Sequence, residues 1–191
     1  MNYKMSYSTW LRTYLKHPLQ LGALFPSGPS LGALMVEHIK PDQHLPILEL
    51  GAGSGSFTRA LLAKGIPEER LILVEQSQDF ANYLEKSFPR AKVICGDATN
   101  VVEILSQSGI HQCSEVVSGI PLYSIGSALR RIICNEALKL LKSGGSLAQV
   151  SYIPRCSIPS DIITAHSARK TYCGMVLKNI PPAFVWRALK S

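Results

Sequence analysis

The 191-residue sequence is 46% hydrophobic and 17% charged, which suits one compact domain with a full core and excludes a disordered or low-complexity chain. Its formal net charge of +7 favours an anionic partner, and nucleic acid, an anionic membrane surface and phosphorylated small molecules all qualify. The five cysteines form no C-x-x-C pair and the five histidines show no ligand spacing, so we expect reduced thiols and no metal site.

The sequence contains neither a membrane-spanning run nor a secretory signal. No apolar run approaches the roughly 20 residues that cross a bilayer, and the N-terminus lacks a short apolar core with a small-residue cleavage site. We therefore expect a cytoplasmic protein. Basic residues gather at both ends of the chain, either as ordinary solvated surface or as a surface for anions: Lys4, Arg12 and Lys16 near the start, and Arg155, Arg169, Lys170, Lys178, Arg187 and Lys190 near the end.

The first predicted element is an amphipathic helix over residues 3–16. Its stripe at helical spacing is rich in aromatic residues: Tyr3, Tyr7, Trp10, Leu11, Tyr14 and Leu15. Such a helix could pack into the core or, because it carries basic residues and no acid, lie in a membrane interface. The breaker-rich loop over residues 21–30 could cover a ligand or simply connect this helix to a second helical pattern over residues 31–39.

An apolar run over residues 47–50 stops at alternating glycines and is followed by a helical pattern over residues 57–64. This order predicts a strand, a glycine-rich turn and a helix. Glycine lets a ligand approach the backbone closely, and the free N–H groups of the turn lie at a helix N-terminus, so the pattern indicates a nucleotide-like ligand. A dinucleotide fingerprint would need its third glycine at Ser56, whereas this chain has Gly51, Gly53 and Gly55.

Two further predicted strands, over residues 71–75 and 92–98, reach acidic residues where they end. The carboxylate of Glu75 can accept hydrogen bonds from both hydroxyls of a ribose, and that of Asp97 can accept one from the amine of adenine. Glu49 adds a third carboxylate at the tip of a parallel-type strand, and ligands of open α/β sheets bind at such tips. The sequence therefore predicts one nucleoside pocket.

The rest of the chain continues the alternation of helices and strands. Helices are predicted over residues 79–88, 101–108, 124–141 and 161–170, and strands over residues 115–123 and 146–153. Two runs on either side of Pro181 and Pro182 are typical of a final antiparallel pair of strands. We expect the chemistry of the substrate where the strand over residues 115–123 runs into its turn.

The pattern Glu-x-Gly-x-Gly-x-Gly over residues 49–55 resembles motif I of the class I S-adenosylmethionine-dependent methyltransferases. Nearly the whole chain further resembles the small bacterial phospholipid N-methyltransferases, which are relatives of the ribosomal RNA adenine dimethylases. The segments that carry this resemblance are residues 17–27, 48–55, 118–122 and 179–186, and the last two are the more specific. The resemblance implies an α/β, Rossmann-like class I methyltransferase fold with a seven-stranded sheet whose last strand is antiparallel. It also implies an N-terminal amphipathic helix and lid segment over residues 1–40 and a cofactor-binding domain over residues 41–191.

The resemblance implies S-adenosylmethionine as the cofactor. The residues expected to bind it are Glu49, Gly51, Ala52, Gly53, Gly55, Glu75, Gln76, Asp97, Ala98 and Ser118. The residues expected to handle the acceptor lie in the turn after the fourth predicted strand and are Ser118, Gly119, Ile120, Pro121 and Tyr123. No residue qualifies as a general base, so we expect the enzyme to position a neutral amine, with Ile120, Pro121 and Leu122 desolvating it and Tyr123 or Ser118 orienting it.

The acceptor is inferred from the same turn. In the adenine dimethylases it reads Asn-Ile/Leu-Pro-Tyr, and the amide and the ring hold a flipped base. Here Gly119 and Leu122 replace those two residues, although Tyr123 could supply a ring. The resemblance implies methylation of phosphatidylethanolamine and its partly methylated derivatives at an anionic membrane surface. We also expect a monomer that associates peripherally with the inner face of the cell membrane. Methylation of adenine N6 in ribosomal RNA or another nucleic acid, and a non-catalytic nucleoside-binding module, are the alternatives.

Overall fold

The computed structural model describes residues 28–40, 44–179 and 181–191. The helix predicted over residues 3–16 and most of the loop predicted over residues 21–30 lie outside this part of the chain, so the division at residue 40 stays a prediction. Among the described residues, no helix combines the length and the apolar character needed to cross a membrane.

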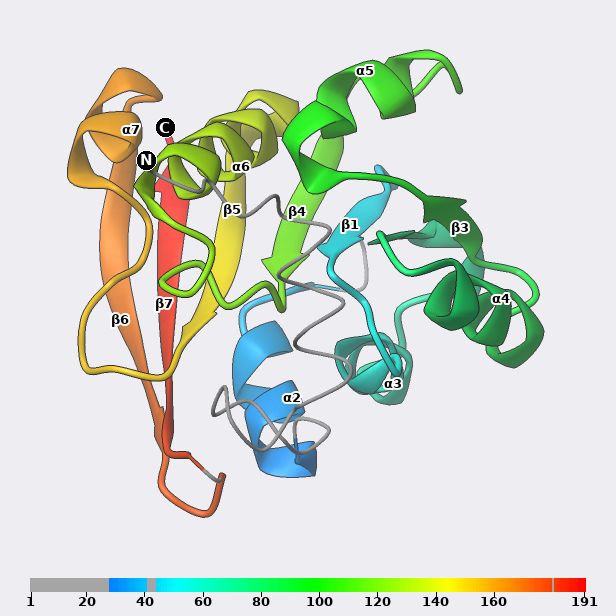
Figure 1. Ribbon diagram of the computed structural model, residues 1–191, viewed down its shortest axis with the longest axis horizontal. Coiled ribbons are helices and arrows are strands. Elements are labelled where there is room, and N and C mark those ends of the chain that lie inside the picture. The colour runs from blue at the N-terminus through cyan, green and yellow to red at the C-terminus, as the bar shows by residue number, and fades with distance from the viewer. Residues whose placement is uncertain (1–27, 41–43, 180) are drawn as a thin grey trace, which may run out of the picture.

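The described chain folds into one seven-stranded sheet with helices on both faces (Figure 1). The strands are β1 (Ile47–Leu50), β2 (Leu71–Glu75), β3 (Lys92–Cys95), β4 (Cys113–Ser118), β5 (Leu141–Ser151), β6 (Ala168–Val176) and β7 (Ala183–Lys190). The helices are α2 (Pro29–Val36), α3 (Ser56–Ala63), α4 (Gln78–Ser87), α5 (Val101–Ser106), α6 (Ser127–Leu140) and α7 (Ser160–Ala165), with short 3-10 turns η2 (Glu68–Arg70) and η3 (Ala98–Asn100).

The strand order β3-β2-β1-β4-β5-β7-β6 places β1 near the centre of the sheet. Strands β1 to β5 pair in parallel, and β7 runs antiparallel to both β5 and β6. This topology confirms the predicted α/β fold with an antiparallel last strand. It brings the carboxyl ends of β1, β2, β3, β4 and β5 to one edge of the sheet.

Alternate side chains of the strands form two separate cores. Leu48 and Leu50 of β1 pack with α5, α6 and α7, whereas Ile47 packs on the other face with α2, α3 and α4. Every residue of β1 and β2 is buried, as expected for parallel strands that are covered on both sides. The edge strand β3 exposes Lys92, a charge that discourages pairing with another sheet.

The structure corrects two predicted boundaries near the end of the chain. The helix predicted over residues 161–170 ends at Ala165, because Ser167 adopts a left-handed backbone with φ of 51° and Ala168 already pairs with Lys190 of β7. The strand predicted to begin at Ser146 begins at Leu141 instead, with a register irregularity opposite Cys113 and Glu115. In both cases pairing with a distant strand overrides the local signal.

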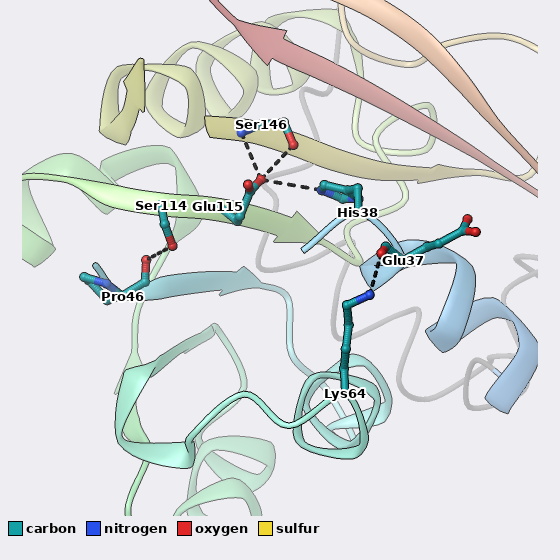
Figure 2. Close-up of polar contacts among 7 residues, drawn as sticks. All are labelled: Glu37, His38, Pro46, Lys64, Ser114, Glu115 and Ser146. Atoms are coloured by element: carbon teal, nitrogen blue, oxygen red, sulfur yellow. Dashed lines mark hydrogen bonds and ion pairs between the residues drawn. The ribbon is translucent and has the colours of Figure 1, made fainter. Parts of the chain in front are cut away.

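A buried polar cluster joins α2 to the middle strands (Figure 2). Glu115 of β4 accepts hydrogen bonds at Oε2 from the backbone N–H and the Oγ of Ser146 on β5, at 2.9 and 2.7 Å. Nε2 of His38, just after α2, lies 3.5 Å from the same oxygen. Nearby, Lys64 after α3 donates to the backbone carbonyl of Glu37. These contacts fix α2 against the sheet away from the edge where β1, β2 and β4 end.

Candidate functional site

The glycine turn after β1 has three residues with positive φ: 68° at Gly51, 53° at Gly53 and 78° at Gly55. A Cβ at Gly51 would lie 2.8 Å from Cγ1 of Ile120, and one at Gly55 would lie 2.5 Å from Cε2 of Phe88. A Cβ at Gly53 would meet nothing within 4 Å. Gly51 and Gly55 therefore serve close packing, and Gly53 is the glycine whose open side a ligand could approach.

Glu75, the last residue of β2, holds this turn. Its Oε2 accepts a hydrogen bond of 2.8 Å from the N–H of Gly53, and its Oε1 accepts one of 2.9 Å from the N–H of Ser77. Burial raises the pKa of the Glu75 carboxyl, and these backbone hydrogen bonds oppose that change. The structure thus brings together the glycine turn and the acidic residue that the sequence placed in one pocket.

Asp97 follows β3 and accepts hydrogen bonds from one predicted neighbour, Gln76, and from Thr99, which was not predicted. Its Oδ1 accepts from the N–H of Thr99 at 2.8 Å, and its Oδ2 accepts from Nε2 of Gln76 at 3.3 Å. Ala98 is buried beside it at the start of η3. Gln76 and Asp97 therefore form a polar pair that bridges the ends of β2 and β3.

Glu49 of β1 is almost completely buried, with 1% of its surface exposed. Its Oε2 accepts a hydrogen bond of 2.7 Å from Oγ1 of Thr58 on α3, and no described residue provides a hydrogen-bond partner for its Oε1. Burial raises the pKa of this carboxyl to about 8, although the Thr58 hydroxyl lowers it in part. Ala52, in the turn, is buried in the core formed with α2, α3 and α4.

The turn after β4 lies directly against the glycine turn. The side chain of Ser118 is fully buried, and its Oγ has no hydrogen-bond partner among the residues that the structure describes. A Cβ at Gly119 would lie 3.0 Å from the carbonyl oxygen of Gly51, so a larger residue there would require the glycine turn to shift. The side chains of Ile120 and Leu122 are packed in the core with α5 and α6, and Pro121 is partly exposed.

Tyr123 ends this turn and is held on both sides. Its hydroxyl donates a hydrogen bond of 2.8 Å to the carbonyl of Cys156, and the guanidinium of Arg130 lies 4.9 Å from the centre of its ring. Burial raises the pKa of the hydroxyl, and the charges of Arg130 and Arg155 oppose that change. Tyr123 also lines a cavity of about 480 Å³ with Arg130 and Arg155.

Gln149 of β5 is a site residue that the sequence analysis missed. It pairs with Ser118 of β4 on one side and with Trp186 of β7 on the other. Its Nε2 donates to the carbonyls of Ile120 and Val150, at 2.9 and 2.7 Å, so its buried Oε1 is left without a donor. The signal that could have predicted a role for Gln149 is its position as the one polar residue in the otherwise apolar run Leu147–Val150.

The fold matches solved methyltransferases. The described sheet superposes with the precorrin-6y C5,15-methyltransferase of Geobacter metallireducens at a TM-score of 0.62, with 16% identity over 85% of this chain and 88% of that one. The sequence is 33% identical over 148 residues to the ornithine lipid N-methyltransferase of Singulisphaera acidiphila, which covers 76% of this chain and 77% of that enzyme. The chain belongs to the class I S-adenosylmethionine-dependent methyltransferases.

A second relative matches only a part of the methyltransferase. The ribosomal RNA small subunit methyltransferase A of Maridesulfovibrio salexigens is 35% identical over 78 residues, which is 41% of this chain and 29% of that enzyme. No protein-family model matches the sequence. In the described part of the chain, no three His, Cys, Asp or Glu side chains gather as a metal site would require.

The methyltransferase takes its methyl group from S-adenosylmethionine, and the residues at the strand tips fit that cofactor. Gly53 leaves one side of the turn open beside Glu75, whose carboxylate could accept from ribose hydroxyls. The unpartnered Oε1 of Glu49 would be satisfied by a cationic or hydrogen-bonding group, such as the ammonium of the methionine moiety.

Proposed function

We propose that this methyltransferase methylates the amine of a lipid headgroup at a membrane surface, with phosphatidylethanolamine and its partly methylated derivatives as acceptors. The observation that carries the proposal is the 33% identity, over 77% of its length, to an enzyme named for N-methylation of ornithine lipid. Phosphatidylethanolamine and ornithine lipid both present an amine beside an anionic group. Of these two lipids, phosphatidylethanolamine is supported by the resemblance of the 118–122 and 179–186 segments to phospholipid N-methyltransferases.

For cofactor binding we assign one role to each strand tip. Glu75 would accept from the ribose hydroxyls, and the pair Gln76 and Asp97, with Ala98, would face the adenine. Glu49, Ser118 and the glycine turn with Ala52 would hold the methionine end. The hydrogen bonds that join Gly53 to Glu75 and Gln76 to Asp97 support one continuous pocket.

For the acceptor, the chain's own residues bind and orient a neutral amine. The sulfonium of the cofactor supplies an already activated methyl group, so positioning carries much of the rate. The unpartnered Ser118 Oγ and Gln149 Oε1 are hydrogen-bond acceptors on adjacent strands, and they would direct the amine lone pair away from themselves. The buried surroundings would lower the pKa of the amine and keep it unprotonated.

Methylation of adenine in RNA is the second candidate. It is favoured by the ribosomal RNA methyltransferase relative, but the match covers only 29% of that enzyme. The turn after β4 carries Gly119 and Leu122, so at those positions it has neither an amide to accept from adenine nor a ring to stack on it. Tyr123 does not replace that ring freely, because its face is covered by Arg130.

Transfer of a labelled methyl group tests the proposal. The full-length protein is given labelled S-adenosylmethionine with vesicles of phosphatidylethanolamine, vesicles of ornithine lipid, or ribosomal RNA, and the products are separated by thin-layer chromatography. We expect label in an amino lipid and none in RNA. Glu75→Ala should abolish transfer, and Glu69→Ala, at an exposed carboxylate paired with Arg90, should not. Label in RNA alone would overturn the lipid assignment.

We further propose that the protein is a monomer in the cytoplasm that binds the inner face of the membrane peripherally. The net charge of +7 and the aromatic, basic segment at residues 3–16 support the membrane association. Flotation with vesicles that contain anionic lipid should retain the full chain, and a chain lacking residues 1–17 should be lost from them while still binding the cofactor. Failure of the full chain to float would refute the membrane association.

A further inference from the structure

A cavity of about 480 Å³ opens beside Tyr123, at the edge of the sheet where the parallel strands end. Side chains from α6, from the segment after β5 and from β6 and β7 meet in it. The lining residues that matter here are Tyr123, Arg130, Arg155, Ser157, Lys170 and Trp186. The methyl-transfer chemistry proposed above does not use Arg155, Ser157, Lys170 or Trp186.

The charged residues that line the cavity are all basic. Arg130, Arg155 and Lys170 come from three separate segments, and no acidic residue lines the cavity. Among the described residues, none of the three forms an ion pair. The neighbouring Arg131, by contrast, donates to Asp161 at 2.8 Å outside the cavity. Arg155 and Lys170 are exposed and Arg130 is half-buried, so solvent reaches these charges and an anion could reach them too. Guanidinium groups suit oxyanions well.

Polar atoms with unmade hydrogen bonds point to the same kind of ligand. Ser157 is only 2% exposed, and within the described ranges its Oγ has no hydrogen-bond partner. Nε1 of Trp186 and Nε of Arg130 are also buried without partners. All three atoms can donate a hydrogen bond, and buried donors in folded proteins are nearly always paired. Free hydrogen-bond donors and unpaired cations that line the same cavity are the groups that an oxyanion site requires.

We propose that this cavity binds the oxyanion of the acceptor's headgroup, either the phosphate of a phospholipid or the carboxylate of an amino-acid lipid. The inference rests on the proposed lipid N-methylation, and it names what the enzyme recognises besides the amine. Trp186 gives the cavity an aromatic wall, and its ring is supported from outside the lining by Tyr172 on the adjacent strand, with the two ring centres 4.9 Å apart.

The register of the sheet places this cavity at a useful distance from the acceptor turn. Ser118 pairs with Gln149, and Gln149 pairs with Trp186, so the three lie in one row across β4, β5 and β7. Adjacent strands are about 4.8 Å apart, so Trp186 lies roughly 5 to 10 Å from the expected position of the amine. An amine and an oxyanion separated by a few bonds can span that distance.

A charge-matched pair of double variants tests the proposal kinetically. Arg155→Gln with Lys170→Gln removes two cavity cations, and Arg169→Gln with Lys178→Gln removes two exposed cations outside it. The cavity variant should raise the KM for the lipid acceptor at least about tenfold, with kcat and the affinity for S-adenosylmethionine unchanged, because charge-assisted hydrogen bonds are lost. The control variant should keep the wild-type KM. An effect on phosphatidylethanolamine alone assigns a phosphate, and one on ornithine lipid alone assigns a carboxylate.

A binding measurement separates failure of this proposal from failure of the proposed function. Trp10→Phe leaves Trp186 as the single tryptophan, and its fluorescence is followed while sn-glycerol 3-phosphate or N-alpha-acetylornithine is added at constant ionic strength. We expect a saturable change with at least one probe that the cavity variant loses and the control variant keeps. That response without any lipid methylation would refute the function and leave the cavity site standing. Lipid methylation with an unaltered KM in the cavity variant, and no response to either probe, would overturn the cavity site.

Discussion

Glu49 is a buried carboxyl group at the candidate cofactor site, and its titration has a consequence for stability. Burial raises its pKa from an ordinary value of 4.5 to about 8. Between these values the folded chain holds a proton that the unfolded chain releases, so this group makes the free energy of unfolding fall as the pH rises through that interval. In the wild type this decrease in the free energy of unfolding should be on the order of 4 kcal/mol between pH 5 and pH 9, and Glu49→Gln should remove it.

Urea denaturation of the wild type and the variant at a series of pH values measures this difference. Glu69→Gln is the control, because Glu69 is exposed and paired with Arg90 at the surface. It should follow the wild-type pH profile within about 1 kcal/mol. Parallel profiles for the wild type and Glu49→Gln would show that Glu49 ionises normally in the folded chain.

Gly53 and Gly65 offer a matched pair of glycines. Both have positive φ, 53° and 88°, and at both a Cβ would meet nothing within 4 Å. Alanine at either position should therefore destabilise the fold by a similar amount, about 1 kcal/mol of backbone strain. Only Gly53→Ala should also weaken S-adenosylmethionine binding, at least about tenfold, because its methyl group would occupy the open side of the turn.

Isothermal titration calorimetry with S-adenosylmethionine, beside urea denaturation, distinguishes the two effects. Tight binding by Gly53→Ala would mean that the cofactor does not approach the turn at this residue. Equal loss of binding in Gly65→Ala would mean that general destabilisation, and not contact, explains the change.

At the scale of single residues, the sequence predicted the parts of the site that depend on a local pattern. The structure brings Gly53 to Glu75 and Gln76 to Asp97, as the glycine motif and the strand-end acids indicated. The sequence could not predict that Gln149 lies beside Ser118, because their proximity depends on the pairing of β4 with β5. Arg155 and Lys170 were noted as basic residues near the end of the chain, but that they line one cavity with Arg130 could not be predicted, for the same reason.

Among the elements, the contact of β4, β5 and the end of α2 is held by one carboxylate. Glu115 accepts two hydrogen bonds from Ser146 and lies beside His38 (Figure 2). Glu115→Ala would leave the N–H and the hydroxyl of the buried Ser146 without this acceptor. We expect the free energy of unfolding to fall by about 3 kcal/mol.

Chemical denaturation of Glu115→Ala and Glu69→Ala measures that loss against a surface pair. The Glu69 variant removes the exposed ion pair with Arg90 and should lose less than about 1 kcal/mol. The Glu115 variant should still bind S-adenosylmethionine, because Glu115 lies three residues before the carboxyl end of β4. Losses of equal size in the two variants would contradict a structural role for the buried cluster.

Element types were predicted more reliably than element ends. The strand at residues 71–75 was predicted with its observed bounds, because its apolar run is bordered by charged residues on both sides. The helix predicted to residue 170 failed where β6 begins, since Ala168 to Lys170 read locally as helix but pair with β7. Only the assembled sheet supplies the hydrogen-bond partners that decide that boundary.

In the whole molecule, the two lateral halves of the sheet carry residues with different proposed roles. Strands β3, β2 and β1 carry the carboxylates proposed for the cofactor, and β5, β7 and β6 carry or border the residues of the basic cavity. Strand β4 lies between them and ends in the turn expected to handle the acceptor. The residues of the half with β1, β2 and β3 could be predicted, because they follow a motif that the sequence shares with many methyltransferases. The cavity in the other half could not, because it depends on the register of β5, β6 and β7.

The row that runs through Ser118, Gln149 and Trp186 belongs to a rigid hydrogen-bonded sheet, so in the proposed reaction the sheet would set how far the methyl donor lies from the oxyanion of the acceptor. Such a fixed distance would select acceptors by length. The ethylene linker of phosphatidylethanolamine and the longer side chain of ornithine present their amines at different reaches from the charge. Changing the segment between β5 and α7, which supplies Arg155 and Ser157, should therefore alter which lipid is methylated without altering how the cofactor is held.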